Sequence, residues 1–141
     1  ARDYFSDKFL YASYFLLGAR YYAGLQKYKM ASFHLHQAAE NYLRTIPLVY
    51  ILYGYKDHAL EILMDRCKTH TLQLVSVFPR NTEEERRLFN LLQDAYVQAR
   101  YNKDFVVTKT DIDALIPRLE LMRDITEKVC CDRIAYYERQ S

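Results

Sequence analysis

The sequence is poor in residues that interrupt helices. It has three glycines, three prolines and no tryptophan among its 141 residues. Because an all-β domain needs turn residues and positive φ angles at each hairpin, this scarcity excludes that class and favours long helices. A chain of this length buries roughly 68–70% of its unfolded surface, which is enough for a core without disulfides or metal. We therefore expect one all-α domain spanning residues 1–141.

Cysteine is also scarce, and its placement limits the chemistry that the chain can carry. Cys67, Cys130 and Cys131 are odd in number, and two of them are adjacent. Such an arrangement forms neither a disulfide framework nor a CxxC metal-binding pair. A reducing, cytoplasmic location fits it best.

Neither charge nor hydropathy indicates a membrane or a nucleic-acid partner. Twenty Lys and Arg against 18 Asp and Glu give a net charge of +2, so any recognition of an anion must be local. No apolar run approaches the roughly 18–20 residues of a membrane span, and the amino end has no signal peptide, so we expect no membrane partner. The chain begins at Ala1 without an initiating Met, which suggests the carboxyl-terminal part of a longer chain.

Apolar and aromatic residues recur at three- and four-residue spacing in several stretches, which is the pattern of amphipathic helices. The spacing predicts a bundle of about five helices with a four-helix up-and-down core, over residues 4–28, 35–53, 57–78, 82–99 and 110–129. The third stretch is interrupted by a polar segment at 66–71, so it predicts either one helix or two short ones. Pro47 and Pro117 lie inside the second and fifth stretches and are expected to bend them.

Helix ends are also marked in the sequence. Gly54 follows the second stretch and is expected to cap its carboxyl end. Thr82 and Glu85 have the spacing of a capping box, in which the threonine hydroxyl accepts a hydrogen bond from the backbone N–H three residues later. Thr110 and Asp113 repeat this spacing, so we expect the fifth helix to start there.

None of the patterns for metal or covalent chemistry is complete. The Glu-x-x-His pairs of di-iron bundles are absent from the sequence. His36 and Glu40 lie one helical turn apart, but two ligands do not make a metal site. Cys67 and His70 are neighbours on a predicted helix, yet nothing marks an oxyanion hole for a cysteine nucleophile. We expect no metal, no cofactor and no cysteine-based catalysis.

The remaining polar and aromatic residues have ordinary structural interpretations. A polar line on the second helical stretch is interpreted as a solvent-exposed face; it comprises Phe33, His36, Gln37, Glu40 and Arg44. Most of the 14 tyrosines are interpreted as lying at the rim of the core, with the ring buried and the hydroxyl hydrated.

Three motifs occur in a distinctive order along the chain. They are Gln37–Glu40 in the second stretch, Tyr53–Tyr55 followed by a Lys-Thr-His, and Ala95–Tyr101 at the end of the fourth stretch. Together they resemble the HEPN family over nearly the whole chain. The resemblance implies a bundle of about five helices. The most similar-looking relatives carry this domain after a nucleotidyltransferase domain, which is therefore the partner that the resemblance implies.

One branch of this family consists of metal-independent ribonucleases, including toxins of toxin–antitoxin type. Their site pairs an Arg with a His that follows after four to six residues, at the cleft of a dimer. After Arg100 this sequence has no His, and Arg66 with His70 is one residue short of the spacing and lies in another helix. The resemblance thus favours a non-catalytic domain, and a ribonuclease acting on RNA is the alternative.

The other branch comprises non-catalytic, often homodimeric domains that bind a nucleotide or assist a nucleotidyltransferase. By position, the resemblance assigns a nucleotide site to Gln37, Glu40, Tyr96, Arg100 and Tyr101. The family's Lys-Thr-His matches Lys68-Thr69-His70 by its letters and Lys56-Asp57-His58 by its place in the chain. Lys68, His70 and His58 are therefore all candidates.

A physical mechanism can be given for such a site. Arg100 offers a planar fork of donors to a phosphate of ATP or GTP, a Lys or His adds charge, and Tyr96 or Tyr101 stacks on the base. Two alternatives stay open. In one, Glu40 pairs with Arg100 in an interhelical network that holds no ligand. In the other, the domain is purely a helical dimerisation module.

Overall fold

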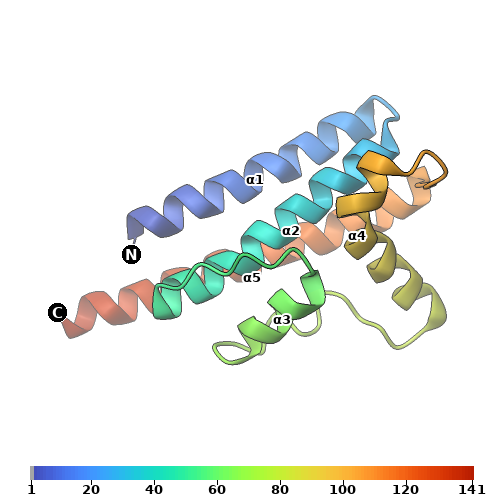
Figure 1. Ribbon diagram of the computed structural model, residues 1–141. Coiled ribbons are helices and arrows are strands. Elements are labelled where there is room, and N and C mark those ends of the chain that lie inside the picture. The colour runs from blue at the N-terminus through green and yellow to red at the C-terminus, as the bar shows by residue number, and fades with distance from the viewer. Residues whose placement is uncertain (1) are drawn as a thin grey trace.

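The fold is a bundle of five α-helices. The computed structural model describes residues 2–141. In chain order the helices are α1 (Arg2–Gly24), α2 (Tyr28–Ile51), α3 (Leu60–Lys68), α4 (Glu83–Tyr101) and α5 (Lys109–Gln140) (Figure 1). No strand occurs within residues 2–141. The predicted all-α bundle is therefore confirmed.

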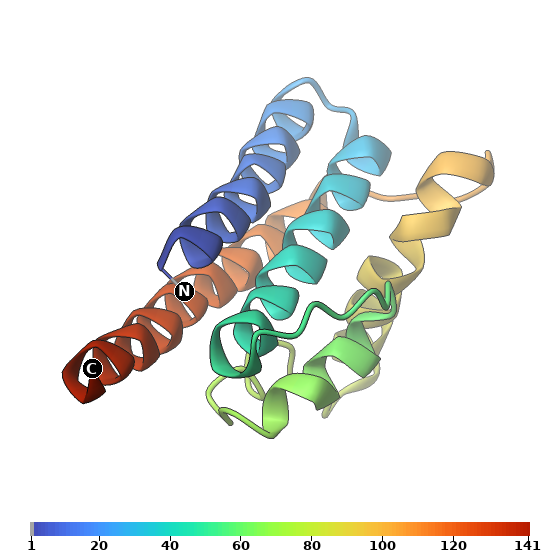
Figure 2. The ribbon, with the colours of Figure 1, turned by 60° about the vertical axis from the view of Figure 1, so that its left-hand side comes forward.

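Helix α2 is the centre of the bundle. It contacts each of the other four helices, and α1 also contacts α5. Figure 2 shows α1 and α5 running alongside α2, while α3 and α4 pack against its other side. The segment 52–59 returns from the end of α2 along that same side to reach α3. This arrangement places α2 side chains opposite the 52–59 segment and α4.

The core forms where the apolar stripes of the four long helices meet. The largest fully buried side chains include Leu35, Tyr42 and Ile46 of α2, together with Leu92 of α4 and Leu119 of α5. Burying a large aliphatic or aromatic side chain stabilises the fold by about 1.5–3 kcal/mol. The hydroxyl of Tyr42 is not left unpaired, because it lies 2.7 Å from the hydroxyl of Ser13 on α1.

One predicted helix cap is confirmed and another is wrong. The Thr82 hydroxyl accepts from the Glu85 N–H at 3.1 Å, and the Glu85 carboxylate accepts from the Thr82 N–H at 2.9 Å. Helix α5 begins with the same box formed by Thr108 and Asp111, not by Thr110 and the aspartate three residues after it. The Thr-x-x-Asp spacing occurs twice in succession, and the earlier copy is chosen because Arg87 of α4 holds the buried Asp111 at 2.7 Å.

The ends of the second and third helical stretches also differ from expectation. Leu52, with φ 55°, is the left-handed residue that caps α2, so the cap lies two residues before Gly54. The third stretch forms one short helix that ends at Lys68, and residues 69–78 form turns. The buried side chains of Leu74, Val77 and Phe78 anchor these turns to the core. Residues 47 and 117 are prolines within continuous helices.

Candidate functional site

The polar face of α2 is the foundation of the candidate site. It was expected to face solvent, but His36 is fully buried and only 2% of Glu40 is exposed. The expectation of an exposed face is therefore wrong. The reason is tertiary, because His58, in the segment that returns along α2, and Tyr96 of α4 lie against these side chains.

Glu40 is the buried carboxylate of this face. One of its oxygens, Oε1, accepts from Nδ1 of His58 at 2.7 Å. The other, Oε2, lies 3.4 Å from Nη1 of Arg44, one turn later in α2. Burial raises the pKa of Glu40 although both partners favour its charged form. Its ion-pair partners are His58 and Arg44, so the alternative in which Glu40 pairs with Arg100 is not formed.

His36 ties the connecting segment to α2. Its Nε2 lies 3.0 Å from the carbonyl oxygen of His58, and its Nδ1 lies 3.3 Å from the side-chain oxygen Oε1 of Gln37. Burial lowers the pKa of His36 to about 4, so the ring is neutral near pH 7. Both oxygens accept and a neutral ring has one N–H, so we assign the proton to Nε2, which makes the shorter contact. His36 thus fixes the backbone at His58, and Gln37 lies beside the other ring nitrogen, Nδ1.

The His58 side chain lies flat against Tyr96. The two ring centroids are 4.3 Å apart and the ring planes differ by 14°. Nε2 of His58 is 3.4 Å from the hydroxyl of Tyr96, at the outer limit of a hydrogen bond. Since Glu40 accepts the proton on Nδ1, the exposed Nε2 is the nitrogen available to a ligand.

Arg100 is the exposed cation of the site. Its Nε donates to the carbonyl oxygen of Tyr96 at 2.7 Å. Its Cζ lies 4.4 Å from the ring centroid of Tyr96, 4.8 Å from that of Tyr101 and 5.3 Å from that of Phe33. No carboxylate lies within ion-pair distance of Arg100 in the part of the chain that the structure describes. Cation–π contacts with these rings therefore stabilise the charge of Arg100, which has no acidic partner.

A surface hollow adjoins this cluster. Its volume is about 460 Å³, and its lining includes His58, Gln93, Asp94, Tyr96 and Gln98. The hollow is therefore of a size that holds a small ligand. Its walls combine an imidazole, a phenol ring, two amides and one carboxylate. These groups offer stacking, donors and an acceptor.

The structure brings together most of the residues that the family resemblance singled out. Glu40, His58, Tyr96 and Arg100 form one connected cluster, with Gln37 behind it and the 74% exposed Tyr101 beside Arg100. We call these six residues the Arg100 cluster. Its histidine is the one that matches the family by its place in the chain.

Lys68 and His70 lie elsewhere. Lys68 pairs with Asp65 at 3.0 Å on the surface of α3, and His70 stacks on Tyr50 with a centroid separation of 4.9 Å. Cys67, which directly precedes Lys68, is buried, donates from its thiol to the carbonyl oxygen of Leu43, and has its pKa raised to about 12 by burial. A thiol in this state is no nucleophile near neutral pH.

Two residues of the site, Phe33 and Arg44, were not among those singled out for binding. Arg44 donates to the carbonyl oxygen of Asp57 at 2.7 Å, so it also fixes the 52–59 segment. The four-residue spacing of Glu40 and Arg44 was the only signal in the sequence, and it is common on any helix.

Residues 2–141 contain neither a metal-binding cluster nor a membrane-spanning helix. No group of three or more His, Cys, Asp or Glu side chains is placed to hold a metal ion. Within the same residues, no helix combines the length and the apolar character that crossing a membrane requires.

Comparison with known proteins identifies the family. The HEPN domain family model matches residues 6–129, a range that includes every member of the Arg100 cluster. No curated protein matches the chain. The family match spans most of the 141 residues and agrees with the all-helical fold. The chain belongs to the HEPN family.

Proposed function

We propose that this HEPN domain is non-catalytic and binds the phosphate of a nucleotide of the ATP or GTP class at the Arg100 cluster. The observation that carries the proposal is the guanidinium of Arg100, which is exposed, stacked on aromatic rings and without a carboxylate partner within residues 2–141. Such a fork of donors fits two phosphate oxygens at once. The buried side of the cluster keeps the neighbouring histidine in place.

Each exposed group of the cluster has a role in this proposal. Arg100 binds the phosphate, and Nε2 of His58 offers a second contact on the same side of Tyr96 as the hollow it lines. The exposed ring of Tyr101 supplies a face on which a base stacks. Asp94 provides an acceptor for a ribose hydroxyl.

The test is isothermal titration with ATP and with GTP. We expect the wild-type domain to bind one of them, and Arg100→Ala to weaken binding at least tenfold. Arg86→Ala removes another exposed arginine of α4 that lies outside the cluster, and it should leave the affinity unchanged. Absence of heat with both nucleotides at millimolar concentration would overturn the proposal, as would equal losses in the two variants.

We further propose that the domain serves a nucleotidyltransferase partner. The support is the family membership together with the motif order that resembles relatives of that arrangement. The coding sequence upstream of Ala1 and the adjacent coding sequence give a direct check. A Gly-Ser followed by paired aspartates in either place supports the partnership, and the absence of this motif from both contradicts it.

A ribonuclease is the second candidate. No His follows Arg100 at the spacing of the family's nucleases, but the fold brings His58 close to Arg100 from another part of the chain. Glu40 orients His58 through Nδ1, and Arg100 lies over the ring on which His58 stacks. An imidazole held by a carboxylate is the arrangement of a general base. Incubation with total RNA separates the candidates. Cleavage that is lost in both His58→Ala and Arg100→Ala would establish a nuclease and overturn the non-catalytic proposal.

Homodimer formation is proposed through the outer face of α1. Leu10, Tyr14, Leu17 and Tyr21 are between 50% and 64% exposed and alternate at four- and three-residue spacing. This spacing is the apolar seam with which one helix packs against another helix, here that of a second copy. Sedimentation velocity at two concentrations should show a dimer that Leu17→Glu dissociates and Val106→Glu, an exposed loop control, does not. A monomer at both concentrations would contradict it.

A further inference from the structure

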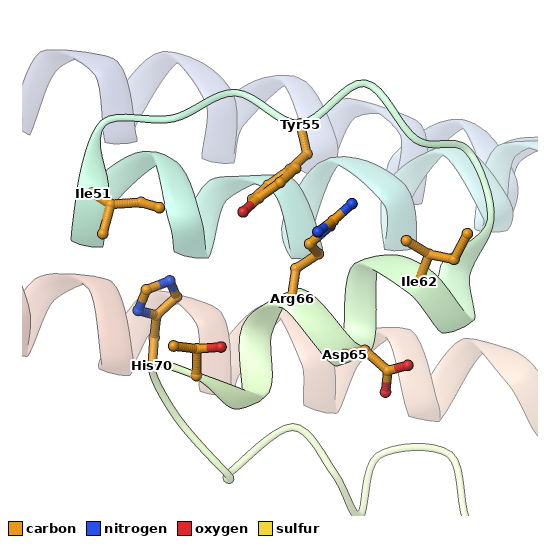
Figure 3. Close-up of a pocket in the computed structure, with 7 residues that line it drawn as sticks. Ile51, Tyr55, Ile62, Asp65, Arg66 and His70 are labelled. Atoms are coloured by element: carbon orange, nitrogen blue, oxygen red, sulfur yellow. The ribbon is translucent and has the colours of Figure 1, made fainter.

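A second hollow lies at the opposite end of the 52–59 segment from His58. Its volume is about 530 Å³, and it is lined by residues from the end of α2, from the segment, from α3 and from the turn after α3, among them Ile51, Tyr55, Arg66 and His70. Figure 3 shows Tyr55 and Arg66 reaching into one space from two elements, with Ile51 and His70 at one side of it. None of these four residues belongs to the Arg100 cluster.

Arg66 and Tyr55 form a stacked pair at the centre of this surface. The Cζ of Arg66 lies 4.4 Å from the ring centroid of Tyr55. The nearest carboxylate oxygen, on Asp57, is 3.8 Å from Nη2, near the limit of an ion pair. The two residues also line an adjoining hollow of about 660 Å³ that contains Tyr53 and Lys56. The surface thus extends along both sides of one Arg–Tyr stack.

A second stack continues the surface toward α5. The His70 ring stacks on Tyr50 with an interplanar angle of 30°, and the Cζ of Arg133 lies 4.9 Å from the centroid of the same Tyr50 ring. Between residues 2 and 141, Arg133 has no carboxylate within ion-pair distance and the His70 ring makes no hydrogen bond. By contrast, Arg2 and Arg87 each lie 2.7 Å from a carboxylate oxygen.

Cations and rings therefore alternate along this surface, and the apolar side chains of Ile51 and Ile62 are exposed at its edge. The acidic residue in the first hollow, Asp65, is neutralised by Lys68 at 3.0 Å. An aromatic ring offers a stacking face to any base. A guanidinium beside it offers donors to a phosphate, and of the two here Arg66 has a distant partner in Asp57 whereas Arg133 has none. A hollow of a few hundred Å³ accommodates a single base.

We propose that this surface, defined by Tyr50, Tyr55, Arg66, His70 and Arg133, binds a nucleotide unit, meaning a base joined to a phosphate. The base lies in the hollow against Tyr55 and Ile51, and Arg66 binds the phosphate of the same unit. When the unit belongs to a strand, Arg133, beyond the hollow, binds the next phosphate. The unit belongs either to a free nucleotide or to a single strand of RNA, since both present the same chemistry. The site is independent of the one proposed around Arg100, because the two share no residue.

Fluorescence anisotropy with labelled ten-nucleotide poly(A) RNA, with AMP as competitor, tests this inference. We expect salt-sensitive binding that Tyr55→Leu and Arg133→Gln each weaken about tenfold, because one stacked base or one phosphate contact is lost. If the RNA binds at least tenfold more tightly than AMP, the site is assigned to a strand. If the two affinities are equal, it is assigned to a free nucleotide. Either result supports the shared chemistry.

Two controls keep the outcome specific. Arg86→Ala removes an exposed arginine of α4 that lies outside both proposed sites, and Lys128→Gln removes an exposed cation of α5 that pairs with Asp132. Both should change the affinity less than twofold. The unfolding midpoint of the Arg133→Gln variant is measured alongside its affinity. Because Arg133 lies in the carboxyl-terminal part of α5, we expect this variant to fold, so that a loss of binding reports on the site. Absence of binding to RNA and to millimolar AMP would overturn the inference, as would binding that only Arg100→Ala reduces.

Discussion

His58 and Glu40 are joined by a hydrogen bond of 2.7 Å between Nδ1 and Oε1, although they are 18 residues apart in the chain. The bond runs from a half-exposed imidazole to a carboxylate that is 2% exposed in the middle of α2. It therefore fixes the returning segment 52–59 on the helix that all the others contact. Five consequences of this and related contacts are open to experiment.

The first prediction concerns Glu40 itself. Glu40→Ala leaves His58 and Arg44 without their buried acceptor, and we expect it to lower the free energy of unfolding by about 1–3 kcal/mol. Glu40→Gln keeps an oxygen that accepts from His58 and removes a charge whose burial is unfavourable, so its cost should be below about 1 kcal/mol. Urea unfolding at pH 7 measures both. Equal losses in the two variants would contradict the balance between burial and hydrogen bonding.

The second prediction is a loss of stability on mild acidification. The pKa of His36 is lowered to about 4 in the fold from an ordinary value of 6.5. Between these values the unfolded chain binds the proton and the folded chain does not, so stability falls as pH falls through 6.5 toward 4. Linkage gives a loss of about 2 kcal/mol between pH 7 and pH 5.

Glu40 acts in the opposite sense, because its raised pKa means that the folded state takes up a proton first as pH falls. A His36→Gln variant removes the histidine contribution and should flatten the pH dependence of the urea midpoint. An NMR titration in which the His36 ring protonates near pH 6.5 would disprove the assignment.

The third prediction separates two glycines of α1. A Cβ at Gly18 would lie 2.7 Å from Cδ2 of His34, whereas a Cβ at Gly24 would meet nothing within 4 Å. Gly18→Ala therefore forces α1 and α2 apart or moves a packed ring, and should cost about 1–3 kcal/mol. Gly24→Ala should be neutral or stabilise slightly. Thermal unfolding of both variants decides, and a harmless Gly18→Ala would show that His34 moves freely.

The fourth prediction concerns thiol reactivity. Cys67 and Cys130 are buried and burial raises the pKa of each thiol, while Cys131 is only half-buried. Ellman's reagent should therefore modify Cys131 alone in the folded protein and all three thiols in denaturant. Cys131→Ser provides the control, since it should abolish the fast reaction. Rapid modification of that variant would mean that the core opens readily.

The fifth prediction tests where α5 begins. Thr108→Ala removes a hydroxyl that accepts from the Asp111 N–H at 3.2 Å, and should cost about 1 kcal/mol. Thr110→Ala alters an exposed threonine with no capping bond and should change stability by less than about 0.5 kcal/mol. Urea midpoints of this matched pair give the answer. The reverse order would restore the later start predicted from the sequence.

Local patterns in the sequence predicted much of the fold. The apolar spacing of α2 and α4 indicated which residues form the core, and Thr82 with Glu85 marked the start of α4. These features depend on neighbours within one or two turns, so the sequence is enough to reveal them. The start of α5 was misplaced because two identical spacings compete locally, and a contact from Arg87 on another helix decides between them.

The candidate site required the tertiary structure. By itself the sequence determined an all-helical chain and the set of residues that resemble the HEPN motifs, because helical periodicity and motif letters are local properties. It left His58 and His70 equivalent and gave His36 and Glu40 a solvent-exposed face. Only the return of residues 52–59 along α2 buries that face, brings His58 to Glu40 and Tyr96, and carries His70 to a different surface. Burial and long-range hydrogen bonds, which no local pattern contains, decide that His58 joins the site and His70 does not.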